Sequence, residues 1–335
     1  MQLLRKLLFP FSLVYALVVY LRNFLYDIGF FSSQKFDVPI VCIGNLSVGG
    51  TGKTPMTEFL LELLKPHYKT AVLSRGYKRK SKGFLIADAD VTVENIGDEP
   101  YQIYQKFPDV TVAVDANRRE GILLLTKRVK PDLIVLDDAF QHRKVKPHVS
   151  VLLTSYGDLY VDDWYLPTGN LRDSKKAAQR ANFIIVTKCP PNLSEEEQIH
   201  ITQKLKHGID QKVLLSYLAY DGILYGLSNQ MKMDALKDRK FTLVTGIANP
   251  APLVLHLKSQ GLTFEHLAFK DHHFFTQKEI DFLSKKELIV TTEKDYVRLK
   301  GHLSNLSYLR VSHRFIGDGK KIIFDALSQF MKARS

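Results

Sequence analysis

The segment Ser47–Thr54, which reads Ser-Val-Gly-Gly-Thr-Gly-Lys-Thr, constrains the fold of this 335-residue chain more than any other feature. It follows the apolar run Val38–Ile43, which predicts a β-strand, and it precedes a pattern typical of a helix. Its glycines let several backbone N–H groups converge on a polyphosphate at the N-terminus of that helix. We therefore predict a loop that binds a nucleoside triphosphate, made of Ser47, Val48, Gly49, Gly50, Thr51, Gly52, Lys53 and Thr54.

Individual residues of this segment have predicted roles. Lys53 is expected to reach the β- and γ-phosphates, and the Thr54 hydroxyl to meet Mg²⁺. Pro55 suits the first turn of a helix, where an N–H group would lack a partner in any case. The general pattern asks for Gly at the first position, where this chain has Ser47. The alternative, an ordinary Gly-rich turn, accounts less well for the strand before it and the helix after it.

Short apolar runs alternate with helical patterns along the first two thirds of the chain, which is typical of βαβ units. We predict an α/β fold like that of P-loop NTPases, with a mostly parallel sheet and helices on both faces. The predicted strands are Val38–Ile43, Thr70–Leu73, Val110–Val114, Leu133–Leu136, Val149–Leu153 and Phe183–Val186, and helices begin near Pro55, Gly97 and Arg118.

A second, smaller α/β domain is predicted after about Arg239. Its expected elements are strands Phe241–Thr245, Leu288–Thr291 and Leu306–Val311, a helix at Pro252–Gln260 and a last helix at about Lys321–Met331. The predicted domains are therefore an N-terminal membrane-associating helix (1–35), a P-loop core (36–222) and a smaller domain that closes over the active site (223–335).

The N-terminal run Leu7–Leu21 is uncharged and mostly apolar, with Pro10 inside it. As a helix it would span roughly 22 Å, short of the roughly 30 Å hydrocarbon core of a bilayer. We expect it to lie on or dip into a membrane. The alternatives are a buried core helix, a true span and a secretory signal, although no small-x-small cleavage site follows it.

The chain carries a net charge of +12, from 47 Lys and Arg against 35 Asp and Glu. This charge favours an anionic partner, namely nucleic acid, acidic lipid or a phosphorylated substrate. The cluster Lys78, Arg79, Lys80 and Lys82 is equally consistent with anionic lipid and with a solvated loop. Cys42 and Cys189 lie far apart in apolar runs, so we expect buried thiols, as suits a reducing cytoplasm.

Polar clusters follow several predicted strands, at the edge where open α/β sheets bind ligands. Asp137 and Asp138 close the strand Leu133–Leu136, where a carboxylate would hold Mg²⁺ opposite the Thr54 hydroxyl. The alternative is a solvated turn. In Ser74–Tyr77, Arg75 and the flexible Gly76 are consistent with grasping a phosphate.

Two further clusters leave alternatives open. Asp98, at the start of a predicted helix, could cap the helix or accept a proton from a nucleophile, and spacing alone favours the cap. Asp271-His272-His273 could form a metal site, but adjacent histidines point in different directions on a regular element. A catalytic orienting role or plain surface polarity is favoured there.

Taken in order, eight segments resemble the conserved blocks of the tetraacyldisaccharide 4′-kinase family, the lipid A kinases of Gram-negative bacteria. In that family a small hydroxyl residue is common at the first loop position, so Ser47 is expected. The segments are Gly44–Pro55, Ser74–Tyr77, Gly97–Pro100, Leu136–Arg143, Leu166–Arg172, Thr245–Ile247, Asp271–His273 and Thr291–Asp295.

The resemblance implies transfer of the ATP γ-phosphoryl group to the 4′-hydroxyl of an acylated glucosamine disaccharide 1-phosphate. The enzyme would be peripheral or monotopic at the cytoplasmic face of the inner membrane, with anionic lipid at its surface. By the same resemblance Asp98 would accept the hydroxyl proton, and His272, from the second domain, would orient Asp98. Lys53 would act on the phosphates. No nucleic-acid or protein partner is predicted.

The family blocks also imply ligands for the metal and the acceptor. Mg²⁺ would be held by Thr54 with Asp137 or Asp138. Asp173, where the family usually has Glu, is a further candidate ligand through water. The predicted acceptor-binding residues are Arg75, Gln141, His142 and Arg172.

Three rival functions share some of these features. A P-loop GTPase or transport ATPase would also use the loop and the carboxylate at the strand end. For a GTPase, however, Thr187-Lys188 is followed by Cys189 and Pro190 instead of the Asn and Asp of a guanine-reading motif. A nucleotide-gated membrane adaptor needs no catalytic base, so Asp98→Ala would leave its activity intact. A nucleic-acid kinase has no use for the apolar N-terminus, and no recognised binding motif accompanies the basic residues.

Overall fold

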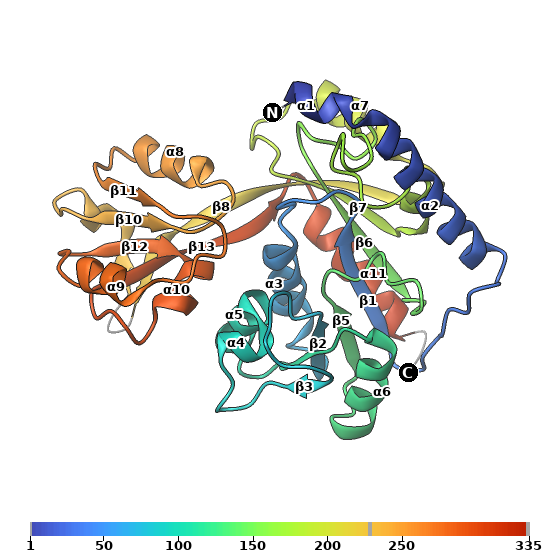
Figure 1. The fold of residues 1–335 in the computed structure, drawn as a ribbon, viewed down its shortest axis with the longest axis horizontal. Helices are drawn as coiled ribbons and strands as arrows, with labels where there is room; N and C mark the ends of the chain where they lie inside the picture. Colours follow the sequence, from blue (N-terminus) through green and yellow to red (C-terminus); the bar gives the residue numbers. More distant parts are fainter. Residues whose placement is uncertain (1, 227–229, 333–335) are drawn as a thin grey trace.

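The computed structural model describes residues 2–226 and 230–332 (Figure 1), so residues 1 and 333–335 of the predicted end domains lie outside it. The core half contains a parallel sheet in which β1 pairs with β5 and β6. The short edge strand β3 (Leu85–Ile86) runs antiparallel to β4. The parallel strands are β1 (Ile40–Asn45), β2 (Thr70–Ser74), β4 (Thr111–Val114), β5 (Leu133–Leu136), β6 (Val149–Ser155) and β7 (Phe183–Thr187).

Helices cover both faces of this core sheet, which confirms the predicted fold class. One face packs against α3 (Lys53–Leu64) and α5 (Asp98–Lys106), through residues such as Leu60 and Ile103. The other packs against α6 (Arg118–Arg128), the 3₁₀ helix Lys175–Arg180 and α7 (Glu195–Leu205). Strands β1 and β5 are buried at every position, as expected for strands between two helical layers.

The smaller half lies apart from the core in Figure 1. Its strands β10 (Thr242–Thr245), β11 (Glu265–Ala268), β12 (Ile289–Thr292) and β13 (Leu306–Phe315) pair in parallel. Its helices are α8 (Ala251–Ser259), α9 (Gln277–Leu283) and α10 (Glu293–Leu299), and it has two separate buried clusters of its own. The sequence analysis missed β11, whose side chains are half-buried or exposed and lack an apolar pattern.

Two long antiparallel strands connect the halves and make one continuous sheet. Strand β8 (Lys212–Gly226) pairs with β7 in the core and with β13 in the smaller half. We call β8 and β13 the ribbon. The predicted domain boundary at 222/223 falls inside β8, which the sequence analysis did not identify because Tyr217, Asp221 and Gly222 interrupt any regular alternation.

The last helix, α11 (Gly319–Lys332), lies on the core and not in the smaller half, to which the range 223–335 assigned it. Its Ile323 and Leu327 are buried in the same cluster as Phe59 and Leu60 of α3. The correction follows from the ribbon, because β13 returns the chain to the core before α11 begins.

At the N-terminus, α1 (Gln2–Leu7) leads into α2 (Phe9–Asp27), with Pro10 in the first turn of α2. The helix extends beyond Leu21, the end of the predicted run, and is long and apolar enough to cross a membrane by length and composition. Only 17% of the apolar window of this helix is buried against the rest of the protein. The buried residues are Ser12, Val19 and Asn23.

Candidate active site

The predicted phosphate-binding loop joins β1 to α3. Gly49 and Gly52 have φ angles of +118° and +84°, which side-chain-bearing residues rarely adopt. The Ser47 hydroxyl donates to Asp163 at 3.1 Å, and the Val48 N–H donates to the Asn170 carbonyl at 2.8 Å. The loop is thus fixed by a neighbouring segment, while Val48, Gly49 and Gly50 are exposed. The helix begins at Lys53, with Gly52 as its N-cap, two residues before Pro55.

Lys53, Asp138 and Arg172 come together beside the loop, as their predicted roles require. The Lys53 ammonium lies 3.7 Å from Asp138 and 3.4 Å from the Asn45 side-chain oxygen. Arg172 donates to Asp138 and, at 2.5 Å, to the same Asn45 oxygen. Burial raises the pKa of Asp138, but Lys53 and Arg172 outweigh it and lower that pKa overall. Asp138 is therefore an ionised carboxylate between two cations.

Asp137 is fully buried beside this cluster. Its two carboxylate oxygens accept hydrogen bonds from the hydroxyls of Thr57 (3.1 Å) and Ser74 (3.2 Å). Burial first, and then the charge of Asp138, raise its pKa to about 6. A divalent cation would offset both effects, and hydroxyl and carboxylate oxygens are the ligands that Mg²⁺ prefers. The carboxylates of Asp137 and Asp138 therefore suit a divalent cation, and Thr54 as a further ligand stays a prediction.

Asp173 has different surroundings. It is fully buried, and it accepts hydrogen bonds from the Asn23 side chain at 2.7 Å and the Ser174 N–H at 2.8 Å. Arg180 lies 3.5 Å away. These partners link α2 to the core and are not residues of the loop, so the contacts give Asp173 a structural role. Its role as a metal ligand stays a prediction.

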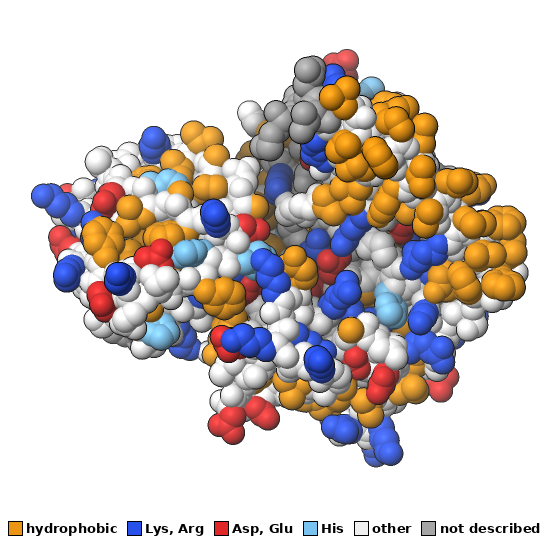
Figure 2. Space-filling view, viewed as in Figure 1, with side chains coloured by type: hydrophobic (Ala, Val, Ile, Leu, Met, Phe, Trp, Pro, Cys, Tyr) orange, Lys and Arg blue, Asp and Glu red, His pale blue; other side chains and the backbone are white. Residues whose placement is uncertain are grey.

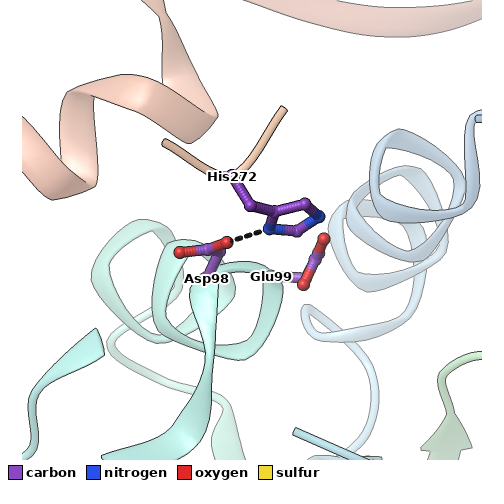
Figure 3. Close-up of side chains that lie close together, drawn as sticks. All are labelled: Asp98, Glu99 and His272. Atoms are coloured by element: carbon purple, nitrogen blue, oxygen red, sulfur yellow. Dashed lines mark hydrogen bonds and ion pairs between the residues drawn. The ribbon is translucent and has the colours of Figure 1, made fainter. Parts of the chain in front are cut away.

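The second part of the site centres on Asp98 and His272 (Figure 3), which are 174 residues apart. Asp98 opens α5, but Gly97 is the N-cap and no side-chain capping bond is present there, so the capping role favoured by spacing is wrong. Instead, one Asp98 oxygen lies 2.5 Å from Nδ1 of His272, in the segment between β11 and α9. His272 has a φ of +61°, and its N–H donates to the Gly246 carbonyl at 3.1 Å.

The sequence analysis missed Arg298, which holds both oxygens of Asp98. Its Nε donates to one oxygen at 2.9 Å, and a second guanidinium nitrogen donates to the other. Burial raises the pKa of Asp98, yet the hydrogen bonds and charges of His272 and Arg298 lower it far below its usual range. Arg298 lies on α10 only three residues after the family block Thr291–Asp295. That proximity was the signal in the sequence that could have pointed to Arg298.

Lys294 completes the ring of charges around His272. Its ammonium is 3.0 Å from Nε2 of His272, 3.3 Å from Glu99 and 3.5 Å from Asp271. Although Asp98, Glu99 and His272 offer ligand atoms within 4.8 Å of one another, Lys294 and Arg298 already supply positive charge there, which opposes a metal ion.

The two adjacent histidines diverge, as predicted. His273 turns away from Asp98 and lies 3.0 Å from Glu279. The structure therefore favours the orienting role of His272 over a paired metal site.

Of the predicted acceptor-binding residues, Gln141 and His142 are half-buried and Arg75 is exposed. Gln141 donates to the Asn45 carbonyl at 2.6 Å. Burial, followed by the charges of Arg118 and other cations, lowers the pKa of His142 to about 4. Its Nε2 has no hydrogen-bond partner within the described part of the chain. Arg118, a buried cation that the sequence analysis did not single out, thus belongs to this region.

Comparison with known proteins gives a consistent result. The family model described as tetraacyldisaccharide-1-P 4′-kinase matches residues 4–331. A tetraacyldisaccharide 4′-kinase of Flavobacterium johnsoniae is 52% identical over 322 residues, covering 94% of each chain. One from Flavobacterium psychrophilum is 47% identical over 329 residues, covering 96% of this chain and 95% of the relative.

A solved structure agrees with these relatives. The crystal structure of the "apo" form of LpxK from Aquifex aeolicus in complex with ATP has a TM-score of 0.79 and 32% sequence identity. The match covers 96% of this chain and 99% of that one. The predicted resemblance, lipid A kinase function and use of ATP are thereby confirmed. The chain belongs to the tetraacyldisaccharide-1-P 4′-kinase family.

Proposed function

We propose that this site transfers the γ-phosphoryl group of ATP to the 4′-hydroxyl of tetraacyldisaccharide 1-phosphate, with Asp98 as the proton acceptor. The observation that carries the assignment is the Asp98 carboxylate, which is buried, ionised and fixed by His272 and Arg298. Burial and then Asp138 raise the pKa of Asp137, and the charge of Glu99, the residue next to Asp98, contributes in the same direction.

In the reaction a bond forms between the acceptor 4′-oxygen and the γ-phosphorus, and the bond from that phosphorus to the β–γ bridging oxygen breaks. The hydroxyl proton passes to Asp98, and ADP leaves. The transition state of phosphoryl transfer is loose, so the new bond is weak until late and a carboxylate of low pKa suffices as the acceptor. Lys53 and the loop N–H groups would offset charge on the phosphates.

Bound Mg²⁺ would neutralise charge on the β- and γ-oxygens, with Thr54 and Asp137 or Asp138 as its protein ligands. Lys53 would then turn from Asn45 and Asp138 toward the phosphates. Arg172 would keep Asp138 in place, since the two are already hydrogen-bonded.

The acceptor's 1-phosphate suits the basic region around His142. After burial, the charges of Arg118, Lys144, Arg22 and Arg75 lower the pKa of His142, so the local charge at the ring is positive. An anionic group would offset this excess of charge, and the Nε2 of His142 is free of partners within the described residues. We therefore assign acceptor binding to Arg75 and His142, with Arg118 as an addition.

The N-terminal helix presents its polar side inward and its apolar side outward, as Figure 2 shows by the hydrophobic side chains gathered over α2. Ser12 and Thr168 share a hydrogen bond of 2.7 Å, and Asn23 donates to Asp173. On the outer side, Phe11 and Leu17 are 65% and 66% exposed. A helix held to a protein in this way buries its apolar face only in another apolar medium. We propose that α2 lies flat in the interface at the cytoplasmic face of the inner membrane.

The basic cluster at Lys78–Lys82 is partly engaged by the protein itself. Arg79 donates to the carbonyls of Val114 and Gly83, and Lys80 pairs with Glu94 at 2.7 Å. Contact between this cluster and anionic lipid remains a prediction.

The membrane proposal is tested by sedimentation with anionic vesicles. Phe11→Ser together with Leu17→Gln should abolish cosedimentation, whereas Leu255→Gln, at a 66% exposed position on α8, should not. Equal binding by both variants would refute it.

The catalytic proposal is tested by transfer of γ-labelled phosphate from Mg-ATP to tetraacyldisaccharide 1-phosphate in mixed micelles. Labelled lipid from the unmodified protein, strongly reduced in Lys53→Ala and Asp98→Ala, is the expected result. Transfer that survives Asp98→Ala would move the base elsewhere. ATP hydrolysis without labelled lipid would favour the ATPase alternative.

A further inference from the structure

The orientation of the peptide groups in the phosphate-binding loop depends on contacts behind the loop. In a trans peptide the C=O of one residue and the N–H of the next point in opposite directions. If the N–H groups of Gly52 and Lys53 are to face a phosphate, the carbonyls of Thr51 and Gly52 must point away from it. A buried carbonyl also needs a hydrogen-bond donor.

Both carbonyls have donors from outside the loop. The Thr187 hydroxyl, on β7, donates to the Thr51 carbonyl at 2.9 Å. The Gly52 carbonyl accepts from the Met56 N–H of α3 at 3.1 Å, and the Nε2 of His313, on β13, lies 3.1 Å from the same oxygen as its donor from outside the helix. A Cβ on Gly52 would come within 3.0 Å of that Nε2, so the ring packs directly on the loop backbone.

The protonation state of His313 is fixed by its neighbours. A carbonyl only accepts, so Nε2 must carry the proton that reaches Gly52. Nδ1 then accepts from the Ser216 hydroxyl, 3.1 Å away on β8. Burial lowers the pKa of His313 to about 4, in agreement with a neutral ring, and the side chain is 4% exposed. The ring is therefore a fixed donor aimed at one carbonyl.

We propose that His313 is a positioning residue for ATP binding: its Nε2–H fixes the Gly52 carbonyl and so aims the Lys53 N–H at the phosphates. The inference rests on ATP binding at this loop. Because β13 also pairs with β12 in the smaller half, the contact ties the loop to the ribbon that joins the two halves. By linkage, ribbon position and ATP affinity then influence each other.

Two substitutions separate this role from plain packing. Gln can place its amide nitrogen near the position of Nε2, whereas the shorter Asn can reach only the position of Nδ1 and keep the contact with Ser216. We expect His313→Asn to raise the dissociation constant and KM for Mg-ATP about tenfold, the cost of one hydrogen bond to a buried group. His313→Gln should stay within about threefold of the unmodified protein, by the same reasoning.

The measurements are calorimetric Mg-ATP binding, KM for ATP and for the lipid acceptor, and the melting temperature without nucleotide. Unchanged lipid KM and melting temperature, with rescue by Gln, support the proposal. The proposal is overturned if His313→Asn binds Mg-ATP as tightly as the unmodified protein does. It is also overturned if His313→Asn and His313→Gln lose ATP affinity equally.

Ser216→Ala gives a second route that leaves the ring in place. It removes the hydroxyl that holds Nδ1 and so keeps the ring in place, and ATP affinity should therefore fall about threefold. An unchanged affinity would overturn the proposal. Lys53→Ala distinguishes a failure of the His313 proposal from a failure of the proposed function. If Lys53→Ala binds Mg-ATP and transfers phosphate normally, the assignment of the loop to ATP binding is wrong.

Discussion

The phosphate-binding loop and the Asp98 site are built in different ways. The loop is eight consecutive residues between β1 and α3, and Lys53 finds its partners Asn45 and Asp138 within the core half. The Asp98 site joins a core helix to the smaller half, since Arg298 lies 200 residues from Asp98 in the chain. The first uses residues of the core and of the adjoining ribbon, whereas the second exists only when the two halves are docked.

A buried charge cluster supports that docking. Lys106 of α5 contacts Glu58 of α3 at 2.6 Å and Glu293 of α10 at 3.2 Å, so one ammonium bridges both halves. The comparison predicts that substitutions at the Asp98 site affect the catalytic step more than nucleotide binding, because only the Asp98 site needs residues of both docked halves.

The largest effects are expected from the two central residues. Lys53→Met and Asp98→Asn should each lower kcat by about 10³-fold, because one loses charge compensation and the other loses the proton acceptor. Only Lys53→Met should weaken Mg-ATP binding. Calorimetry on both variants checks this, and a comparable loss of ATP affinity in Asp98→Asn would show that the two sites are not separable.

Arg298→Gln should alter the pH dependence of the reaction. Arg298 stabilises ionised Asp98 by hydrogen bonding and charge, so its removal raises the pKa of Asp98. Because Asp98 accepts a proton only when ionised, the acidic limb of the kcat/KM profile should move to higher pH. The exposed Arg314 serves as the control, since Arg314→Gln should leave the profile in place. If the acidic limb of the kcat/KM profile stays at the same pH in Arg298→Gln, Asp98 is not the base.

Lys106→Met should destabilise the contact between the halves. It leaves the buried carboxylates of Glu58 and Glu293 without their shared cation, at a cost of about 3 kcal/mol in the free energy of unfolding. Burial and Glu293 already raise the pKa of Glu58, so stability from this group is present at low pH and lost as pH rises.

The loss in Lys106→Met should accordingly be larger at pH 8 than at pH 5.5 in urea unfolding. Adding Glu58→Gln should restore part of it, since the amide carries no charge. A loss independent of pH would point to packing instead of charge.

The smallest effect is expected at the surface pair Lys80–Glu94, which belongs to neither site. Lys80→Ala should change the free energy of unfolding by less than about 0.5 kcal/mol, because both side chains are solvated. If the basic cluster meets lipid, the same substitution should weaken binding to anionic vesicles by no more than about fivefold. A large loss of kinase activity in detergent micelles would contradict this view of the cluster.

Much of the fold was predictable because its signals are local. The parallel strands of the core are continuous apolar runs, and β5 (Leu133–Leu136) lies where the pattern predicts it. The ribbon was not predictable in the same way, because β8 passes from a buried environment to a half-exposed one along its length. No single periodicity describes such a strand.

The candidate active site also has a part that was predictable from the sequence and a part that was not. The positions of Lys53, Asp137 and Asp138 follow from the loop and a strand end, which fix backbone geometry over a few residues. The surroundings of Asp98 did not follow from its sequence position, because its partners Arg298 and His272 come from the other half.

The sequence alone determined the loop, the parallel core and the apolar N-terminal helix, because each depends on the order of neighbouring residues. Only the tertiary structure decided that Asp98 meets Arg298, that Asp173 binds α2, and that His313 supports the Gly52 carbonyl. Those contacts join residues more than a hundred positions apart. Their geometry is set by the packing of whole elements, which no local pattern encodes.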